Sequence, residues 1–177
     1  MIARFDLKCK GTGGHVRHIG MDFYDCQGGC LPKNGVDSRL ILFLDKLHEH
    51  YNSDLYVTSG HRCYQHNLFS YMELAAEGKD PKVINLDSKH ITVGELEKCC
   101  AVDFVITPYN AKNLSEMVEK DFPILFDEVF EGQYQFNDLF WLKVYEADEG
   151  RDLDNQHNQP YIHIQVKDGM ENIINMK

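Results

Sequence analysis

Hydrophobic residues recur every three to four positions in the segment VDSRLILFLDKLHEHY, from Val36 to Tyr51. This spacing predicts an amphipathic helix, because residues three and four apart lie on one helical face. Asp37 or Ser38 can cap its first turn. The apolar side chains expected near its buried face are Leu40, Leu42, Phe43, Leu44 and Leu47.

Three later segments have the composition or alternation of strands. DLYVTSGHR is β-branched and aromatic and stops at Ser59-Gly60, which places Arg62 just past a strand end. A second apolar strand is expected over Ala101 to Ile106. In QPYIHIQVK, polar and apolar residues alternate, so a third strand is expected over Tyr161 to Val166, with His163 on its less apolar face.

Further helices are expected over Cys63 to Glu77, ended by Gly78, and over Asn110 to Lys120, with Pro123 marking the exit. The segment QYQFNDLFWLKVYEA predicts one or two strands, with Phe140 and Trp141 buried. Together these patterns indicate an α+β protein with a mostly antiparallel sheet, in a single domain spanning residues 1–177.

Composition narrows the possible functions. Hydrophobic residues make up 43% of the 177 residues and charged residues 26%, which favours a soluble globular chain without a membrane span. The formal charge of −10 and the lack of a basic stripe make nucleic acid a poor candidate partner. No apolar run follows MIARFDLKCKG, so we expect cytoplasmic synthesis without a signal peptide. The six cysteines are then expected to be free thiols or metal ligands.

The most informative position is Asp103, a carboxylate inside the apolar run Ala101 to Ile106. An unpaired buried charge costs several kcal/mol, about 3–5 when one partner of a buried pair is removed. A cationic side chain, a hydrogen-bond network or a metal ion can each compensate this charge. His90 and His163 are the nearby candidates for a metal, because catalytic zinc commonly takes three ligands from His, Asp and Glu.

Four short motifs resemble a known family. SGHRCYQHN (59–67), SKH (88–90), AVDF (101–104) and YIHIQ (161–165) occur in the order seen in the zinc D-Ala-D-Ala carboxypeptidases and L,D-endopeptidases of peptidoglycan. The resemblance implies the Hedgehog/DD-peptidase fold, a small antiparallel sheet with packed helices. It implies a Zn²⁺ cofactor and a peptidoglycan peptide substrate. The resemblance further implies that the metal is bound by His90, Asp103 and His163. It implies that Arg62 contacts the substrate and the transition state and that Ser88 contacts the substrate.

The chain departs from the family pattern in two places. VGELEKCC lengthens the connection between His90 and Asp103, which a loop bulging outward can absorb at little entropic cost. Some branches place a glutamate base three residues before the last zinc histidine, where this chain has Pro160. His157 is therefore the expected general base, with Asp154 as the alternative.

The cysteines leave two questions open. Cys99 and Cys100 are either core thiols or competing metal ligands. Three others are either unligated or part of a structural zinc site completed by a nearby histidine or Cys63; they are Cys9, Cys26 and Cys30.

The sequence is therefore compatible with three functions. The first is zinc-dependent hydrolysis of stem-peptide bonds that involve D-amino acids. The second is a module of the same fold that binds cell-wall peptide without cutting it, and the third is a metal-stabilised structural protein of a phage or mobile element. The phage-type resemblance implies release to the cell wall by lysis, and no sequence feature indicates an oligomeric state.

Overall fold

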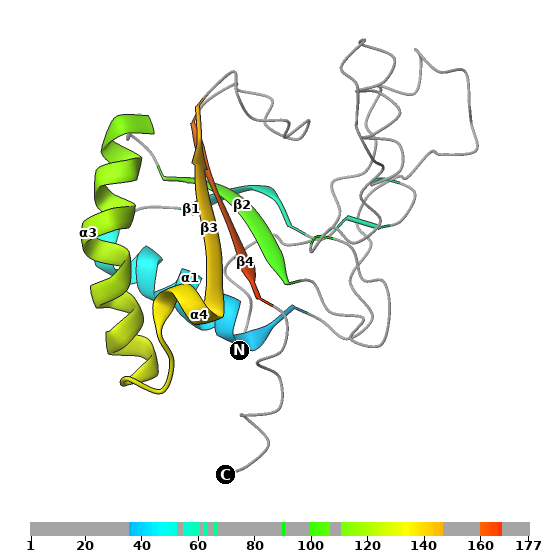
Figure 1. The fold of residues 1–177 in the computed structure, drawn as a ribbon. Helices are drawn as coiled ribbons and strands as arrows, with labels where there is room; N and C mark the ends of the chain where they lie inside the picture. The colour runs from blue at the N-terminus through cyan, green and yellow to red at the C-terminus, as the bar shows by residue number, and fades with distance from the viewer. Residues whose placement is uncertain are drawn as a thin grey trace, which may run out of the picture.

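The computed structural model of the chain describes residues 36–52, 55–60, 62–63, 66, 90, 100–106, 111–146 and 160–167. Its helices are α1 (Ser38–Tyr51), α3 (Ala111–Phe130) and α4 (Phe136–Leu139), and its strands are β1 (Leu55–Ser59), β2 (Ala101–Ile106), β3 (Phe140–Tyr145) and β4 (Tyr161–Val166). The strands form one antiparallel sheet in the order β1-β2-β4-β3 (Figure 1). The predicted α+β class and antiparallel sheet are confirmed.

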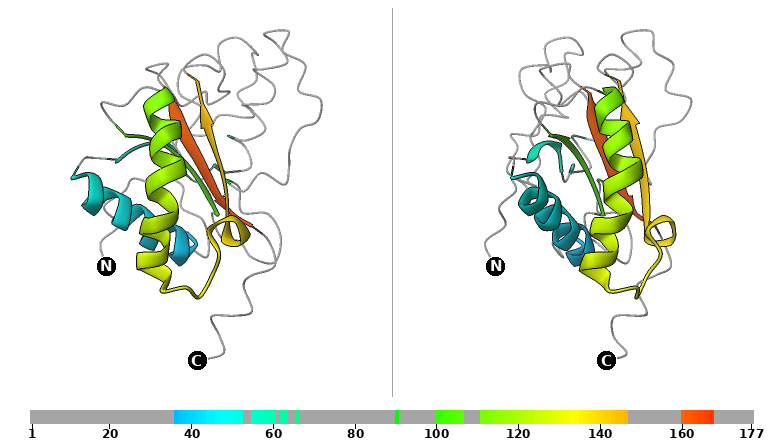
Figure 2. Two further views of the ribbon diagram at one scale, coloured as in Figure 1. Left: turned by 60° about the vertical axis from the view of Figure 1, so that its left-hand side comes forward. Right: turned by 90° about the vertical axis from the view of Figure 1, so that its left-hand side faces the viewer.

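The helices α1 and α3 lie on the same face of the sheet (Figure 2). Strand residues alternate between faces, and those on the helical side join the helices in one buried cluster. Six phenylalanines form the centre of this cluster, with neighbouring rings 4.5–6.3 Å apart. They are Phe43, Phe122, Phe126, Phe130, Phe136 and Phe140. The opposite face of the sheet carries Asp103 and His163 among buried apolar residues such as Val105 and Tyr161.

Helix α1 begins as predicted, because the Asp37 carboxylate accepts the backbone N–H of Arg39 at 3.0 Å. The helix ends at Asn52, which has a left-handed φ of 45°. Its buried stripe omits one predicted member, because Leu42 is 45% exposed. Leu42 is two residues from both Leu40 and Leu44, a spacing that places it on the far side of the helix.

The helix expected over Asn110 to Lys120 does not end before Pro123 as predicted, because α3 continues through Pro123 to Phe130. An interior proline costs a helix about 3 kcal/mol, and Pro123 itself is exposed. Beyond it, Leu125, Phe126 and Phe130 are buried. Each buried side chain of this size contributes about 1.5–3 kcal/mol to stability. Burial of the three side chains that follow Pro123 therefore outweighs the cost of the proline.

The segment after α3 folds as the four-residue helix α4 followed by the single strand β3. Phe140 is buried, as predicted, whereas Trp141 is 40% exposed and the prediction of its burial is wrong. Neighbouring residues of a strand point to opposite faces, so only Phe140 reaches the core. The helix predicted from Cys63 to Glu77 lies outside the described residues, apart from Cys63 and His66. None of the described helices has the length and hydrophobicity needed to cross a membrane.

Replacing Phe126 by alanine is expected to lower the free energy of unfolding by about 3–5 kcal/mol, because the change leaves a cavity in the phenylalanine cluster. Ile124, two residues earlier on α3, is 60% exposed and provides a matched control. Ile124→Ala should change the free energy by about 0.5 kcal/mol or less. Urea unfolding of both variants measures the difference, and equal losses would contradict the assigned core.

Candidate metal centre

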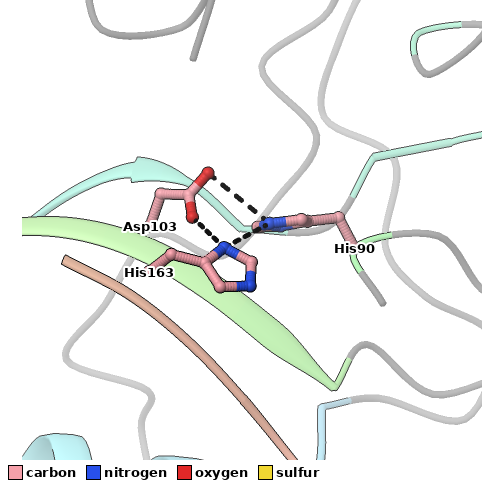
Figure 3. Close-up of side chains that lie close together, drawn as sticks. All are labelled: His90, Asp103 and His163. Atoms are coloured by element: carbon pink, nitrogen blue, oxygen red, sulfur yellow. Dashed lines mark hydrogen bonds and ion pairs between the residues drawn. The ribbon is translucent and has the colours of Figure 1, made fainter. Parts of the chain in front are cut away.

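Three side chains from separate parts of the chain point toward one another on the sheet face opposite the helices (Figure 3). Asp103 lies in the middle of β2, His163 lies in β4, and His90 lies in a turn. One ligand atom from each residue lies within 4.8 Å of the others. His90 and Asp103 are each 4% exposed, whereas His163 is only partly buried.

Strand register brings the first two residues together. Asp103 pairs with His163 across β2 and β4, and directly paired residues of an antiparallel sheet share one face. On the other side of β2, the register with β1 shifts between Val57 and Ser59. Thr58 is the extra residue of this bulge, and the shift brings Ser59 opposite Asp103.

Two backbone-linked hydrogen bonds fasten His90 to the segment that follows β1. The backbone N–H of Arg62 donates to the His90 carbonyl at 2.9 Å, and His90 Nδ1 lies 2.8 Å from the Gly60 carbonyl oxygen. A carbonyl oxygen only accepts, so Nδ1 carries a proton, and in the neutral imidazole Nε2 is the acceptor. That Nε2 lies 3.4 Å from His163 Nδ1 and 3.5 Å from Asp103 Oδ2.

Asp103 is surrounded by potential positive charge. His163 Nδ1 lies 2.5 Å from its Oδ1, and Arg62 Nη2 lies 3.6 Å from its Oδ2. Arg62 Nε in turn donates to the Ser59 hydroxyl oxygen at 2.8 Å, which holds the guanidinium near the cluster. The buried carboxylate is therefore compensated by a cationic side chain and by imidazoles that a metal ion can join.

The electrostatics of the three groups differ. Burial opposes ionisation of Asp103, but the charge of His90 and the hydrogen bond with His163 reverse this effect and hold its pKa well below the usual range. Burial lowers the pKa of His90, and Asp103 offsets this only in part. Burial also acts against the charged form of His163, yet its hydrogen bond to Asp103 raises the pKa of this imidazole overall.

The separations of the ligand atoms test whether zinc fits. Tetrahedral ligands about 2.0–2.1 Å from zinc lie roughly 3.3 Å from one another. The two imidazole nitrogens are 3.4 Å apart, and His90 Nε2 is 3.5 Å from Asp103 Oδ2. Two neutral imidazoles and one carboxylate also form a donor set that suits zinc. The third separation, 2.5 Å between His163 Nδ1 and Asp103 Oδ1, is shorter than this and corresponds to a hydrogen bond, so this pair matches a shared ion only through Asp103 Oδ2. The three residues therefore form a group that could hold a metal ion.

The structure brings together His90, Asp103 and His163 and places Arg62 beside them. Their roles as metal ligands and as a substrate contact stay predictions. Six predicted functional or metal-ligating residues lie outside the described residues: Ser88, Asp154, His157, Cys9, Cys26 and Cys30. Cys99 is also outside them, whereas Cys100 packs into the hydrophobic cluster, which favours a core thiol.

Sequence reasoning did not identify two residues that contact His163. Gln165 Oε1 lies 3.2 Å from His163 Nε2, and the Trp141 ring packs against the imidazole at a centroid distance of 5.2 Å. Gln165 follows His163 by two positions, which places both on one face of β4. That spacing was the signal available in the sequence.

Comparison of the chain with protein-family models, with curated proteins and with solved structures found no match. The Hedgehog/DD-peptidase assignment and the zinc peptidase family therefore stay predictions that rest on the four short motifs.

The metal-free protein is expected to be most stable near pH ~6.5, the ordinary pKa of histidine. As the pH rises above this value, the unfolded chain loses a proton that folded His163 retains, so stability falls through the raised pKa of His163. As the pH falls below it, unfolded His90 takes up a proton that the folded imidazole excludes, so stability falls toward the lowered pKa of His90. Urea midpoints measured across pH in a chelator test both slopes.

His163→Asn should abolish the alkaline decline and keep the acidic one. His50→Asn, which changes an exposed histidine of α1, serves as the matched control and should preserve both. A wild-type stability that rises steadily with pH, and does so equally in His163→Asn, would contradict the assigned His163–Asp103 contact.

Proposed function

We propose that the chain is a zinc-dependent peptidase that hydrolyses bonds involving D-amino acids in peptidoglycan stem peptides, as a carboxypeptidase or an endopeptidase. The observation that carries the proposal is the convergence of His90 Nε2, His163 Nδ1 and the Asp103 carboxylate at separations suited to one ion. Catalytic zinc sites have three protein ligands, whereas structural sites have four. The substrate class rests on the order of the four motifs.

The fixed tautomer of His90 supports a metal over a purely structural network. Its Nδ1 proton is donated to Gly60 and burial lowers its pKa, so in the neutral imidazole Nε2 is an acceptor. The Asp103 carboxylate also only accepts when it is ionised. Two acceptors 3.5 Å apart repel one another, and a shared cation relieves that repulsion. A shared zinc ion satisfies both acceptors and His163 Nδ1 at once.

Held by His90, Asp103 and His163, zinc would lower the pKa of a bound water towards about 7 and would polarise a peptide carbonyl. Arg62 lies at the edge of the cluster, where its planar guanidinium can bind a substrate carboxylate or a developing oxyanion. His157 is proposed to accept the proton from the attacking water, and Ser88 to contact the substrate. The proposed fold is the Hedgehog/DD-peptidase type, which is supported by an antiparallel sheet with helices on one face and the cluster on the other.

A second candidate is a module of the same fold that binds cell-wall peptide and does not cut it. Pro160 favours this alternative, because proline has no side-chain group that can accept a proton where some relatives of the proposed family carry glutamate. Measurement of metal binding and of hydrolysis in the same protein separates the two functions.

Wild-type protein is expected to bind one zinc ion, and His163→Ala should weaken binding by more than about 100-fold, since loss of an outer partner alone typically costs 10–100-fold. Trp141 is the only tryptophan of the chain and packs on His163, so quenching of its fluorescence by cobalt(II) reports on binding at this position. His50→Ala is the matched control and should bind as wild type does. Stoichiometric, equally tight zinc binding by His163→Ala would contradict the assigned centre.

The zinc-loaded protein should release D-alanine or cleave an internal bond when it is incubated with muramoyl pentapeptide. Arg62→Lys is expected to reduce kcat by about 10²-fold, because an ammonium cannot reproduce the forked contact with an oxyanion. His157→Ala should keep the metal and lose hydrolysis. Chromatography of the peptide products measures each rate.

The zinc affinity of Arg62→Lys is measured alongside its turnover, because Arg62 also lies beside Asp103. Lower affinity with unchanged kcat would make Arg62 a support for the ligand instead of a contact for substrate. If wild-type protein binds zinc and the peptide but never cleaves it, the binding-module alternative replaces the peptidase.

A further inference from the structure

At the level of the polar cluster, the exposure of the side chains on this face of the sheet increases toward β3. Asp103 and Val105 of β2 are 4% and 2% exposed. His163 of β4 is half-buried, and Trp141 of β3 is 40% exposed. Among the described residues, β3 therefore provides the most exposed border of the cluster, and a ligand that approaches from this side passes over its side chains.

Three side chains of β3 point to the same face as the cluster. Lys143 pairs with His163 across β3 and β4, and directly paired residues of an antiparallel sheet share one face. Trp141 and Tyr145 lie two positions to either side of Lys143, so they point the same way. We call Trp141, Lys143 and Tyr145 the β3 row. It runs along the border of the candidate metal centre, with Lys143 opposite His163.

The ammonium group of Lys143 is held along this row. Its Nζ lies 4.3 Å from the centroid of the Tyr145 ring, which is a cation–π contact. The Tyr145 ring in turn stacks on the ring of Tyr161, with the centroids 4.9 Å apart, and Tyr161 is buried. A lysine that is already held in this way loses less side-chain freedom when it binds a ligand. The row therefore presents a positioned positive charge beside the cluster.

The charge of the chain makes this lysine distinctive. Lys143 is the only lysine or arginine within the four described strands. The chain carries a formal charge of −10, so an anionic ligand meets overall repulsion and needs a local cation. Arg62 lies on the side of Asp103, whereas Lys143 lies on the opposite side of His163 from Asp103. The two cations therefore flank the cluster.

We propose that Lys143 binds a carboxylate of the peptide that occupies the metal centre and so makes the β3 row an anion subsite. This inference rests on the proposed function for the identity of its ligand and adds a specificity-determining residue outside the metal ligands. The row spans about 13 Å, the length of about four extended residues. A peptide along it can thus place one carboxylate at Lys143 while another part of its backbone lies at the cluster.

A lysine on an edge strand can also serve only to prevent pairing with another chain. β3 is an edge strand of the described sheet, so this structural role is the direct alternative. It would not depend on the charge of a ligand. The experiment therefore changes the charge of both Lys143 and the peptide.

Binding of lysine-containing muramoyl pentapeptide is measured by the fluorescence of Trp141, the only tryptophan of the chain, in a chelator that prevents metal-dependent cleavage. Lys143→Met should weaken binding by about 10-fold, because hydrogen bonds to charged groups are among the stronger ones. Lys143→Arg keeps the charge and should bind within about threefold of wild type. Lys120→Met removes an exposed lysine of α3, on the helical side of the sheet, and is the charge-matched control that should bind as wild type does.

The peptide carries carboxylates on its terminal D-alanine and on its glutamate, and amidation of either one gives a second set of probes. For one of the two amidated peptides, binding by wild type should fall by about 10-fold, whereas binding by Lys143→Met should not fall further. This non-additivity identifies the carboxylate that Lys143 contacts. Lys143→Gln carries the same expectation and keeps the test available if Lys143→Met does not fold.

The results distinguish this inference from the proposed function. Equal binding by wild type and Lys143→Met, or amidation that weakens both proteins equally for each peptide, would overturn the role of Lys143. Both results are compatible with zinc-dependent hydrolysis. Absence of pentapeptide binding by wild type would also overturn it. Conversely, coupling between Lys143 and one carboxylate, together with no hydrolysis by zinc-loaded wild type, would support the anion subsite and overturn the peptidase.

Discussion

The ionised carboxylate of Asp103, placed within a strand whose six residues are all buried, constrains every group around it. Charge at that depth must be matched by nearby positive charge or by hydrogen-bond donors. Arg62 and His163 meet this need, and His90 adds to it when its ring is protonated. Their positions depend in turn on the register of β2 with β4 and on the bulge in β1. The polar cluster therefore compensates a buried charge within the sheet, and it is also a candidate functional site.

The two faces of the sheet divide the tasks of stability and chemistry. On the helical face, apolar residues of β2 and β4 pack with α1, α3 and the phenylalanine cluster. On the other face, the alternate residues of the same strands carry Asp103, His163 and Gln165. Because packed cores are dense and resist displacement, residues anchored from behind in this way can hold their polar neighbours at short, fixed separations. The bulge at Thr58 shifts the register of β1 by one residue, so that Ser59 lies opposite Asp103. Ser59 in turn accepts a hydrogen bond from Arg62 beside the cluster.

Much of this arrangement was predictable from the sequence, and the failures have physical reasons. The strands over Ala101–Ile106 and Tyr161–Val166 and the helix beginning after Asp37 follow from periodicity and capping, and they appear in the structure. The convergence of His90, Asp103 and His163 was expected only from motif order, since spacing does not specify register. The prediction that the helix ends at Pro123 failed, because the burial of residues beyond it outweighs the cost of a proline inside the helix. The prediction that Trp141 is buried failed, because alternation along β3 turns this side chain away from the core. The spacing of Gln165 places it on the same face as His163, but a glutamine side chain alone does not indicate which neighbour it contacts.

The order of the strands in space has a consequence for how the chain acquires its ligands. β4 is last among the described strands in sequence, yet it lies between β2 and β3 in the sheet. During synthesis the chain emerges from its N-terminus, so His90 and Asp103 are available long before His163. Pairing over such sequence separations is slow, because loop closure must precede the contacts that stabilise it. The triad is completed only when β4 inserts between its two neighbours. A metal ion bound by all three residues would therefore mark a chain whose sheet has finished assembling, and a partly folded chain would offer it only an incomplete set of ligands.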